Sequence, residues 1–259
     1  MKEALISVRN LSAWFGERQV LRDVSFTVYR NEVTVILGSS GCGKTTTLKH
    51  LIGLYPVTHG EVEVLGVPLH TATEKQLYDL YLKIGVLFQN GALLNSITVA
   101  ENVAIPLEQH TRLPQEVIEE LVHLKLTLVE LPGVGNLLPS QLSGGMKKRA
   151  ALARAIAMDP PLLFCDEPSA GLDPITMSAL DELILKLKHT LGMTIVLVTH
   201  EVPSIFRLAD RIVFLDAGTV VFEGPLNEAL KSNIPTIKEF FEKGRGENRP
   251  VPPPQPSAS

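Results

Sequence analysis

The sequence has few of the features that mark exported, membrane-spanning or nucleic-acid-binding proteins. Its 259 residues include two cysteines, Cys42 and Cys165, which suits a reducing cytosol and argues against a disulfide. No apolar run reaches the roughly 18 residues that a membrane span needs. The first ten residues, MKEALISVRN, lack the apolar stretch of a signal peptide. Because the net charge is −4, the molecule has no overall basic surface, and we expect no nucleic-acid partner.

The residues that are present indicate a folded α/β protein. The chain is 45% hydrophobic and 20% charged, which is typical of a globular protein with a core. Short apolar, β-branched runs alternate with helical segments along much of its length. The run VTVIL (33–37) has the composition of a buried central strand. The other expected strands are 5–9, 25–29, 61–66, 84–89, 162–167, 194–200 and 211–218.

The order of these segments divides the chain into three parts. Between residues 90 and 157 the strand signals vanish and helical segments replace them. We therefore expect residues 1–89 and 158–240 to form one β/α core around a helical insert. The last ten positions hold five of the 18 prolines, so residues 244–259 are predicted to form a flexible or polyproline II tail.

A phosphate-binding loop follows the predicted central strand. The segment GSSGCGKT matches G-x-x-x-x-G-K-[ST] in full and leads into a helix. Lys44 would supply charge for the β- and γ-phosphates, and the Thr45 hydroxyl is placed for Mg²⁺. A chance glycine-rich turn is the alternative, but it would not require a strand before it and a helix after it. The residues expected to bind nucleotide here are Gly38, Ser39, Ser40, Gly41, Cys42, Gly43, Lys44, Thr45 and Thr46.

Polar residues end three other predicted strands. The apolar run before Asp166 and Glu167 argues against two solvated loop acids, and ligands gather at the carboxyl ends of parallel strands. Asp166 could hold Mg²⁺, while Glu167 would act as general base toward the attacking water. His200 ends a strand expected at the same edge and could reach the γ-phosphate. Gln89 ends another and could bind Mg²⁺ or water.

The segment LSGG (142–145) completes a set of motifs that resembles the nucleotide-binding subunit of ABC transporters. The resemblance covers roughly residues 5–240. It implies an α/β fold in which a P-loop NTPase (RecA-like) core carries an antiparallel β subdomain and a helical subdomain. It also implies ATP as substrate, with Mg²⁺, and a head-to-tail dimer that sandwiches two ATP molecules. Ser143, Gly144 and Gly145 would then meet the γ-phosphate bound by the other chain.

The same resemblance suggests an aromatic residue for adenine. Phe15, just before Gly16, is the preferred candidate to stack on the base, and Trp14 is its rival. A simple packing role is about equally open for either, because single aromatic residues often only fill space.

Met146 and two further segments point to one group within this family. LSGGM, together with the segments 87–111 and 171–177, resembles the ATPases of Mla-type, MCE-associated phospholipid transport systems. That resemblance implies a membrane permease dimer, an MCE-domain protein and, in some members, a small STAS-domain protein. It also implies a peripheral location on the cytoplasmic face of the inner membrane. Met146 stands where a capping box needs Gln or Glu, so we expect a modest loss of helix-start stability that Gln would restore.

Two other functions remain open at this point. One is the ATPase subunit of an importer for a small polar solute, which the adjacent permease gene would distinguish. The other is a soluble ABC ATPase of iron–sulfur assembly, against which co-purification with membranes would argue.

Overall fold

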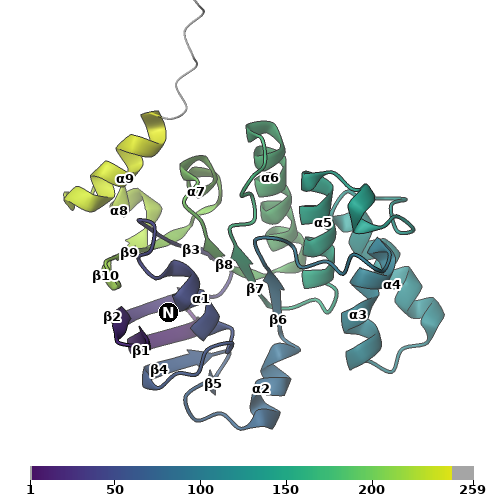
Figure 1. Cartoon of the computed structure of the whole chain (residues 1–259), viewed down its shortest axis with the longest axis horizontal. Coiled ribbons are helices and arrows are strands. Elements are labelled where there is room, and N and C mark those ends of the chain that lie inside the picture. Colours follow the sequence, from purple (N-terminus) through teal and green to yellow (C-terminus); the bar gives the residue numbers. More distant parts are fainter. Residues whose placement is uncertain (1, 247–259) are drawn as a thin grey trace, which may run out of the picture.

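The computed structural model describes residues 2–246, and its central element is a six-stranded sheet in the order β10-β9-β3-β8-β7-β6 (Figure 1). The strands β9, β3, β8, β7 and β6 run parallel, and β10 pairs antiparallel with β9 at the edge. The strands β3, β7 and β8 are buried along their whole length, which explains their continuous apolar sequences. The strand bounds are β3 (Val33–Gly38), β6 (Ile84–Leu87), β7 (Leu162–Asp166), β8 (Thr194–Val198), β9 (Arg211–Asp216) and β10 (Thr219–Pro225).

A second, antiparallel sheet has the strand order β2-β1-β4-β5. Its strands are β1 (Ala4–Phe15), β2 (Arg18–Tyr29), β4 (His59–Val64) and β5 (Val67–Pro68). β1 and β2 are much longer than the predicted segments 5–9 and 25–29. Their pairing shifts register at several points, and Asn10 and Asp23 have positive φ within the strands. These bulges interrupt the alternation of apolar and polar residues, so the sequence revealed only the regular ends.

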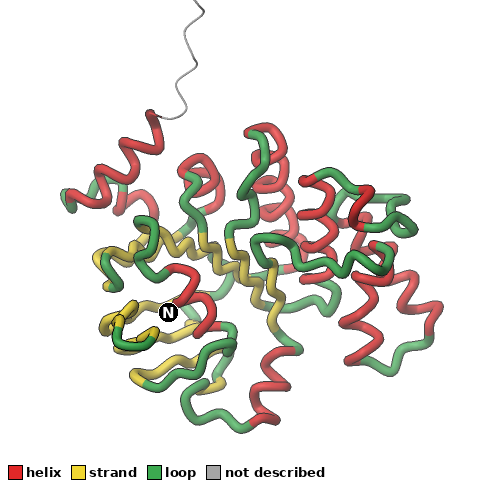
Figure 2. The backbone as a smooth tube through the Cα atoms, viewed as in Figure 1, coloured by secondary structure: helices red, strands yellow, loops and turns green. Residues whose placement is uncertain are grey.

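The helices lie around the two sheets (Figure 2). Of the helices in the described part of the chain, α3, α4 and α5 group together beyond β6 and fall within residues 90–157 (Figure 1). No helix within residues 2–246 is long and apolar enough to cross a bilayer. The helix bounds are α1 (Lys44–Leu51), α2 (Glu74–Tyr81), α3 (Val99–His110), α4 (Gln115–Leu128), a 3₁₀ turn (Pro139–Gln141), α5 (Gly144–Ala155), α6 (Pro174–Leu191), α7 (Val202–Leu208), α8 (Leu226–Ala229) and α9 (Pro235–Gly246).

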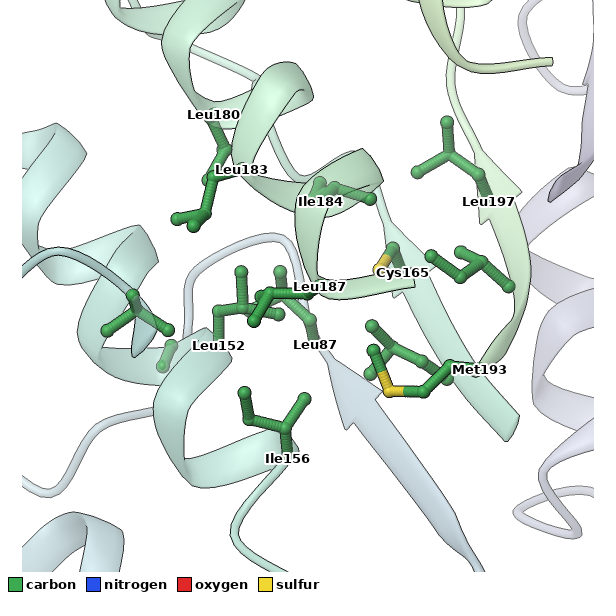
Figure 3. Packing of buried hydrophobic residues seen from close by; sticks show 14 of the residues in the cluster. Leu87, Leu152, Ile156, Cys165, Leu180, Leu183, Ile184, Leu187, Met193 and Leu197 are labelled. Carbon is green, nitrogen blue, oxygen red and sulfur yellow. The ribbon is translucent and has the colours of Figure 1, made fainter. Parts of the chain in front are cut away.

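The helical group shares its core with the central sheet. Leu152 lies on α5, and Ile156 comes directly after that helix. Both point toward Leu187 of α6 and Leu87 of β6 (Figure 3). All four side chains are essentially buried. Because α5 is packed on both α6 and β6, its first turn is held at a fixed place relative to the sheet.

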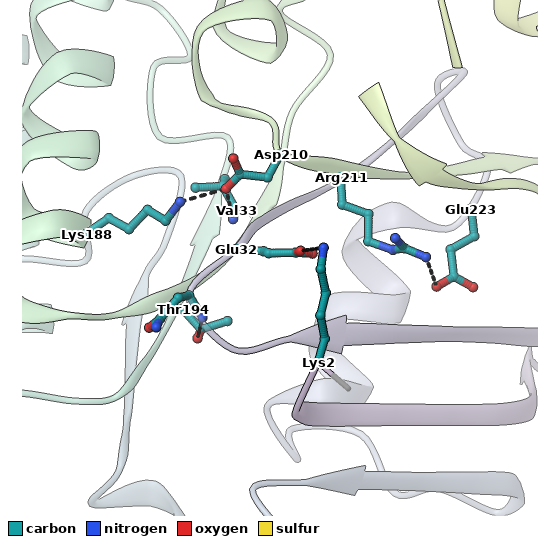
Figure 4. A network of polar contacts seen from close by, with 9 residues as sticks. Lys2, Glu32, Val33, Lys188, Thr194, Asp210, Arg211 and Glu223 are labelled. Carbon is teal, nitrogen blue, oxygen red and sulfur yellow. Dashed lines mark hydrogen bonds and ion pairs between the residues drawn. The ribbon is translucent and has the colours of Figure 1, made fainter. Parts of the chain in front are cut away.

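Polar contacts hold the amino ends of the central strands β3 and β9 (Figure 4). At the start of β3, Asp210 accepts a hydrogen bond from the Val33 amide at 2.8 Å and from Lys188 Nζ at 2.7 Å. Arg211 donates to Glu223 at 3.2 Å, which ties β9 to β10. These contacts fix the amino ends of the strands and leave their carboxyl ends for the site.

The helix α9 packs against β9 and α7. Phe240 stacks edge-on against Phe214 of β9, with 5.5 Å between ring centroids, and Phe241 lies 5.6 Å from Phe206 of α7. The helix continues to Gly246, so the first three positions of the predicted tail, 244–246, are helical. The rest of that tail, residues 247–259, lies outside the described residues.

Candidate nucleotide-binding site

The loop between β3 and α1 has a backbone that only glycine accommodates at two points. Gly38 has φ +146°, and a Cβ there would lie 1.9 Å from the Leu215 carbonyl oxygen. Gly43 has φ +106°, and a Cβ there would lie 2.5 Å from Leu21 Cδ2. The close approach of β9 and β2 therefore explains why the motif has glycine at its first and sixth positions.

Within this loop, Lys44 is folded onto the main chain. Its Nζ donates to the carbonyl oxygens of Gly38 at 2.9 Å and Ser39 at 3.0 Å. Gly43, at the N-cap of α1, offers no side chain to cap the helix. The first amides of α1 are therefore available to a phosphate, and Lys44 can exchange its two carbonyl partners for phosphate oxygens.

Cys42 lies in the same loop but behind its surface. The residue is 3% exposed, and burial raises the pKa of its thiol more than the Lys44 charge lowers it. A neutral, buried thiol is a poor nucleophile and a poor redox sensor. Cys42 therefore serves the loop as a small buried side chain.

A cavity of about 740 Å³ lies above the carboxyl ends of the central strands. Its walls come from the phosphate loop, the ends of β6 to β9, the start of α7, and α9. Nine of the predicted site residues line it, namely Gly38, Ser39, Ser40, Gly41, Lys44, Thr45, Gln89, Glu167 and His200. The remaining wall is formed by Val202, Phe214, Asp216, Thr236, Glu239 and Phe240.

The cavity wall includes residues that the sequence reasoning missed. Asp216 ends β9 in the same manner as Asp166 ends β7, but the predicted strand 211–218 ran two residues too far and placed Asp216 inside it. Thr236, Glu239 and Phe240 come from α9, and no motif marks them. Their position depends on the packing of a C-terminal helix against β9, which local sequence does not encode.

Other predicted site residues lie elsewhere. Phe15 does not line the cavity; it is 50% exposed, and its ring lies 5.7 Å from Tyr55, edge-on. Trp14, its rival, stacks edge-on with His59 at 4.8 Å. Thr46 lies on α1 beneath the loop and accepts a hydrogen bond at its carbonyl from His50 Nδ1 at 2.8 Å. The adenine role of Phe15 stays a prediction.

The acidic pair at the end of β7 is largely shielded from solvent, and the backbone of Glu167 is strained. Asp166 is 8% exposed and Glu167 is 9% exposed. Glu167 has φ +46°, in the left-handed region that non-glycine residues rarely adopt, and its amide donates to the Val198 carbonyl at 2.8 Å. Its Oε1 lies 2.8 Å from His200 Nδ1. Because a carboxylate only accepts, the Nδ1–H of His200 is the donor and orients Glu167.

Three buried oxygen atoms near this pair have no hydrogen-bond partner: Asp166 Oδ1, Glu167 Oε2 and Ser169 Oγ. Leaving such atoms unsatisfied costs about 1–3 kcal/mol each. Oxygen ligands of this kind are those that Mg²⁺ prefers, directly or through water. The residues present therefore fit a bound Mg²⁺ with its water shell beside the phosphate loop.

The pKa of Asp166 agrees with this interpretation. Burial raises it first, the charge of Glu167 raises it further, and the charges of Lys49, Lys148 and Lys44 oppose the rise. A divalent cation at this point would reverse the balance and favour the ionised carboxylate. Burial of this carboxylate is costly, and a bound divalent cation would offset that cost.

The signature segment, residues 142–145, lies away from this cavity. Ser143 caps α5, and its Oγ accepts a hydrogen bond from the Met146 amide at 3.3 Å. Ser143 and Gly144 are exposed, whereas a Cβ on Gly145 would lie 2.6 Å from Thr176 Cγ2 of α6. None of these residues lines the cavity, so one chain does not bring its own signature to its own phosphate loop.

Met146 has a role that the sequence did not reveal. Its side chain is partly buried and packs against the large hydrophobic cluster. The expectation that Gln at this position would simply restore a capping box therefore left out a packing contact.

We predict that Met146→Gln does not stabilise the protein. The capping gain of about 0.5–1 kcal/mol is offset by lost apolar burial. Thermal unfolding of the isolated subunit measures this, and Met146→Leu, which keeps the apolar contact without a cap, is the control. A rise in stability of the full capping value would contradict the packing interpretation.

Comparison with known proteins identifies the family of the chain. The sequence pattern described as "ABC transporter" matches residues 21–170. The chain is 41% identical over 239 residues to the Escherichia coli (strain K12) intermembrane phospholipid transport system ATP-binding protein MlaF, covering 92% of this chain and 88% of that one. It is 38% identical over 240 residues to the Mycobacterium tuberculosis (strain ATCC 25618 / H37Rv) probable ribonucleotide transport ATP-binding protein mkl, covering 93% of this chain and 67% of that one.

The similar solved structures also come from ATP-binding cassette proteins. A dimeric ATP-binding cassette, MJ0796, in a post-hydrolysis state with ADP and phosphate, superposes with a TM-score of 0.77 at 32% identity. The match covers 85% of this chain and 98% of that one. The protein cbiO1 from Clostridium perfringens, part of an ABC transporter complex, superposes with a TM-score of 0.82 at 26% identity, covering 93% of this chain and all of that one. The family match and the MlaF identity extend over most of the chain, which therefore belongs to the ABC transporter family as one of its ATP-hydrolysing subunits.

Proposed function

We propose that this chain is the ATPase of a phospholipid transporter in the cell envelope, acting through a membrane permease. The observation that carries the proposal is its 41% identity to a phospholipid-transport ATPase over 92% of its length. The cavity supplies the chemistry, since it gathers the phosphate loop, Glu167, His200 and Gln89 around one space.

In the proposed reaction, each side chain at the cavity has a defined task. Lys44 leaves the two loop carbonyls and binds phosphate oxygens. Thr45, Gln89 and Asp166 would hold Mg²⁺, which neutralises charge on the β- and γ-phosphates when bound. Glu167, held by His200, accepts a proton from the water whose oxygen attacks the γ-phosphorus. The bond from that phosphorus to the bridging oxygen breaks, and ADP and phosphate leave.

We propose that the site is completed by a second copy of the chain. The exposed signature residues Ser143 and Gly144 start a helix whose N-terminus suits a phosphate. Their place outside the cavity of their own chain supports a head-to-tail dimer with two shared sites. The dimeric form of the cassette MJ0796 supports it as well.

A groove beside the segment after Gln89 is the proposed contact with the permease. It has a volume of about 300 Å³ and lies between α2, β6, α3 and α5. Exposed aromatic and aliphatic side chains lie on or near these elements, including Tyr78, Tyr81 and Leu94. A peripheral position on the cytoplasmic side of a membrane permease dimer follows from this contact. An MCE-domain protein as further partner belongs to the same proposal, and a STAS-domain partner stays a prediction.

A transporter of polar solutes is the second candidate. The relative from Mycobacterium tuberculosis carries a ribonucleotide-transport name at 38% identity. Because ATPase subunits contact the nucleotide and the permease rather than the cargo, their active sites do not distinguish these functions.

The test is to purify the chain with the permease encoded beside it. Phospholipid retained by the complex is measured by mass spectrometry, and ATP hydrolysis is measured with added phospholipid or ribonucleotide. We expect bound phospholipid above the level of an unrelated membrane protein, and lipid-dependent ATP hydrolysis. Retention at the background level, with hydrolysis stimulated by ribonucleotide, would contradict phospholipid transport.

A further inference from the structure

Helix α5 holds the segment after β6 by three main-chain carbonyls. Lys148 Nζ donates to the carbonyl of Gln89, Arg154 Nη2 donates to that of Gly91 at 2.9 Å, and Arg154 Nη1 donates to that of Ala92 at 2.9 Å. All three acceptors lie in the short stretch 89–92, and both donors lie on one helix. Residues 89–92 lie outside the helices and strands, so the side chains of Lys148 and Arg154 supply the hydrogen bonds to these carbonyls.

The stretch also lies directly on the helix surface. Gly91 has φ +70°, and a Cβ there would lie 3.1 Å from Ala151 Cβ, one turn beyond Lys148. Ala92 also has a positive φ, of 51°. The Gly91 amide donates to the Phe88 carbonyl at 2.8 Å and so closes a turn against α5. The backbone that carries Gln89 is therefore fixed to α5 by close packing as well as by hydrogen bonds.

Lys148 is an unusual residue to use for this contact. It is 8% exposed, and burial lowers its pKa, while the charges of Glu167 and Asp166 act to raise it. Burying an ammonium group is costly unless it is paired and hydrogen-bonded. The Lys148 ammonium group is therefore hydrogen-bonded to Gln89 and also feels the charges of the acidic pair at the end of β7.

The same helix begins at the signature. Ser143 caps α5, and Lys148 follows in its second turn. We propose that Lys148 is a positioning residue that fixes Gln89 to the helix bearing the signature. Gln89 of one nucleotide site and the signature that completes the other site then move as one unit. This inference rests on the site assignment proposed above.

The test compares Lys148→Met with Lys147→Met in the full chain. Methionine keeps the length of the side chain but loses the charged donor, and Lys147 is the exposed neighbour on the same turn. Hydrogen exchange at the Gly91 amide is measured first, in the nucleotide-free protein. We expect Lys148→Met to speed this exchange roughly tenfold or more, the factor that corresponds to losing a charged hydrogen bond. Lys147→Met should leave it unchanged.

Turnover is then measured with the permease present. In Lys148→Met we expect kcat to fall by roughly tenfold or more, with the affinity for an ATP analogue changed less than about threefold, because the phosphate loop is intact. Lys148→Gln, which restores a donor without the charge, should recover most of the exchange protection, and it provides a second variant if methionine prevents folding. Unchanged exchange in Lys148→Met, or equal effects of Lys147→Met, would overturn the positioning role. Since the exchange readout needs neither ATP nor hydrolysis, this result is independent of the proposed function.

Single-site heterodimers test which nucleotide site Lys148 serves. One chain carries Glu167→Gln, so the only competent phosphate site belongs to the other chain. Adding Lys148→Met to that other chain, which holds the competent Gln89, should lower turnover roughly tenfold or more. Adding it to the Glu167→Gln chain should have the smaller effect. The reverse order would contradict the proposal, because it would place the effect at the signature alone.

Discussion

Replacing Glu167 by Gln is expected to lower steady-state ATP hydrolysis by about 10²–10⁴-fold, the usual contribution of a general base. Glutamine keeps the size of the side chain and can still accept a hydrogen bond from His200 Nδ1, which lies 2.8 Å from Oε1 in the parent. It cannot take a proton from water at neutral pH. ATP binding should therefore persist, and the ATP-bound dimer should accumulate.

Hydrolysis is measured with the permease present, and dimer formation by size-exclusion chromatography with ATP. Glu201→Gln is the matched control, because Glu201 is the other carboxylate near His200, at 3.6 Å from Nε2, and does not line the cavity. Turnover near the parental rate in Glu167→Gln would remove Glu167 from the role of base. Equal losses in both variants would point to the electrostatics of His200 instead.

Lys44→Ala should instead weaken nucleotide binding itself. Lys44 is the one lysine on the cavity wall within the described residues, and a charged hydrogen bond contributes about 1.5–3 kcal/mol, or roughly 10–150-fold in affinity. Its loss also leaves the carbonyls of Gly38 and Ser39 without their present donor.

Binding of a fluorescent ATP analogue to the isolated subunit measures this effect without hydrolysis. Lys75→Ala is the control, since Lys75 forms an exposed ion pair with Asp79 at 2.7 Å, remote from the loop. Parental affinity in Lys44→Ala would mean that the phosphate-loop assignment is wrong.

The sequence predicted those parts of the site that depend on local rules. The glycine loop needs a strand before it and a helix after it, and both are present around Lys44. Glu167, His200 and Gln89 gather because parallel strands end at one edge of a sheet, a rule that requires no knowledge of side-chain contacts. The α/β class followed from the continuous apolar runs of the buried strands.

The remaining features depend on contacts between segments far apart in the chain. The bulges at Asn10 and Asp23 hid the length of β1 and β2. The contribution of α9 to the cavity arises from the packing of Phe240 on Phe214. Lys147, Lys148 and Arg149 form a basic run after the signature, and nothing in that run shows that Lys148 is buried against a loop about 60 residues earlier in the chain. Such pairings are set by the tertiary fold and leave no periodic signal.

The central claim is that each ATP site combines the phosphate loop of one chain with the signature of another. It is tested most directly by co-expressing Ser143→Asp with Lys44→Ala and isolating the mixed dimer with its permease. Aspartate still caps α5 but sets a negative charge against the incoming γ-phosphate. Each variant alone should be nearly inactive, whereas the mixed dimer holds one site with both Lys44 and Ser143 intact and should hydrolyse ATP. A mixed dimer as inactive as its parents would place both residues in the same site and contradict the account.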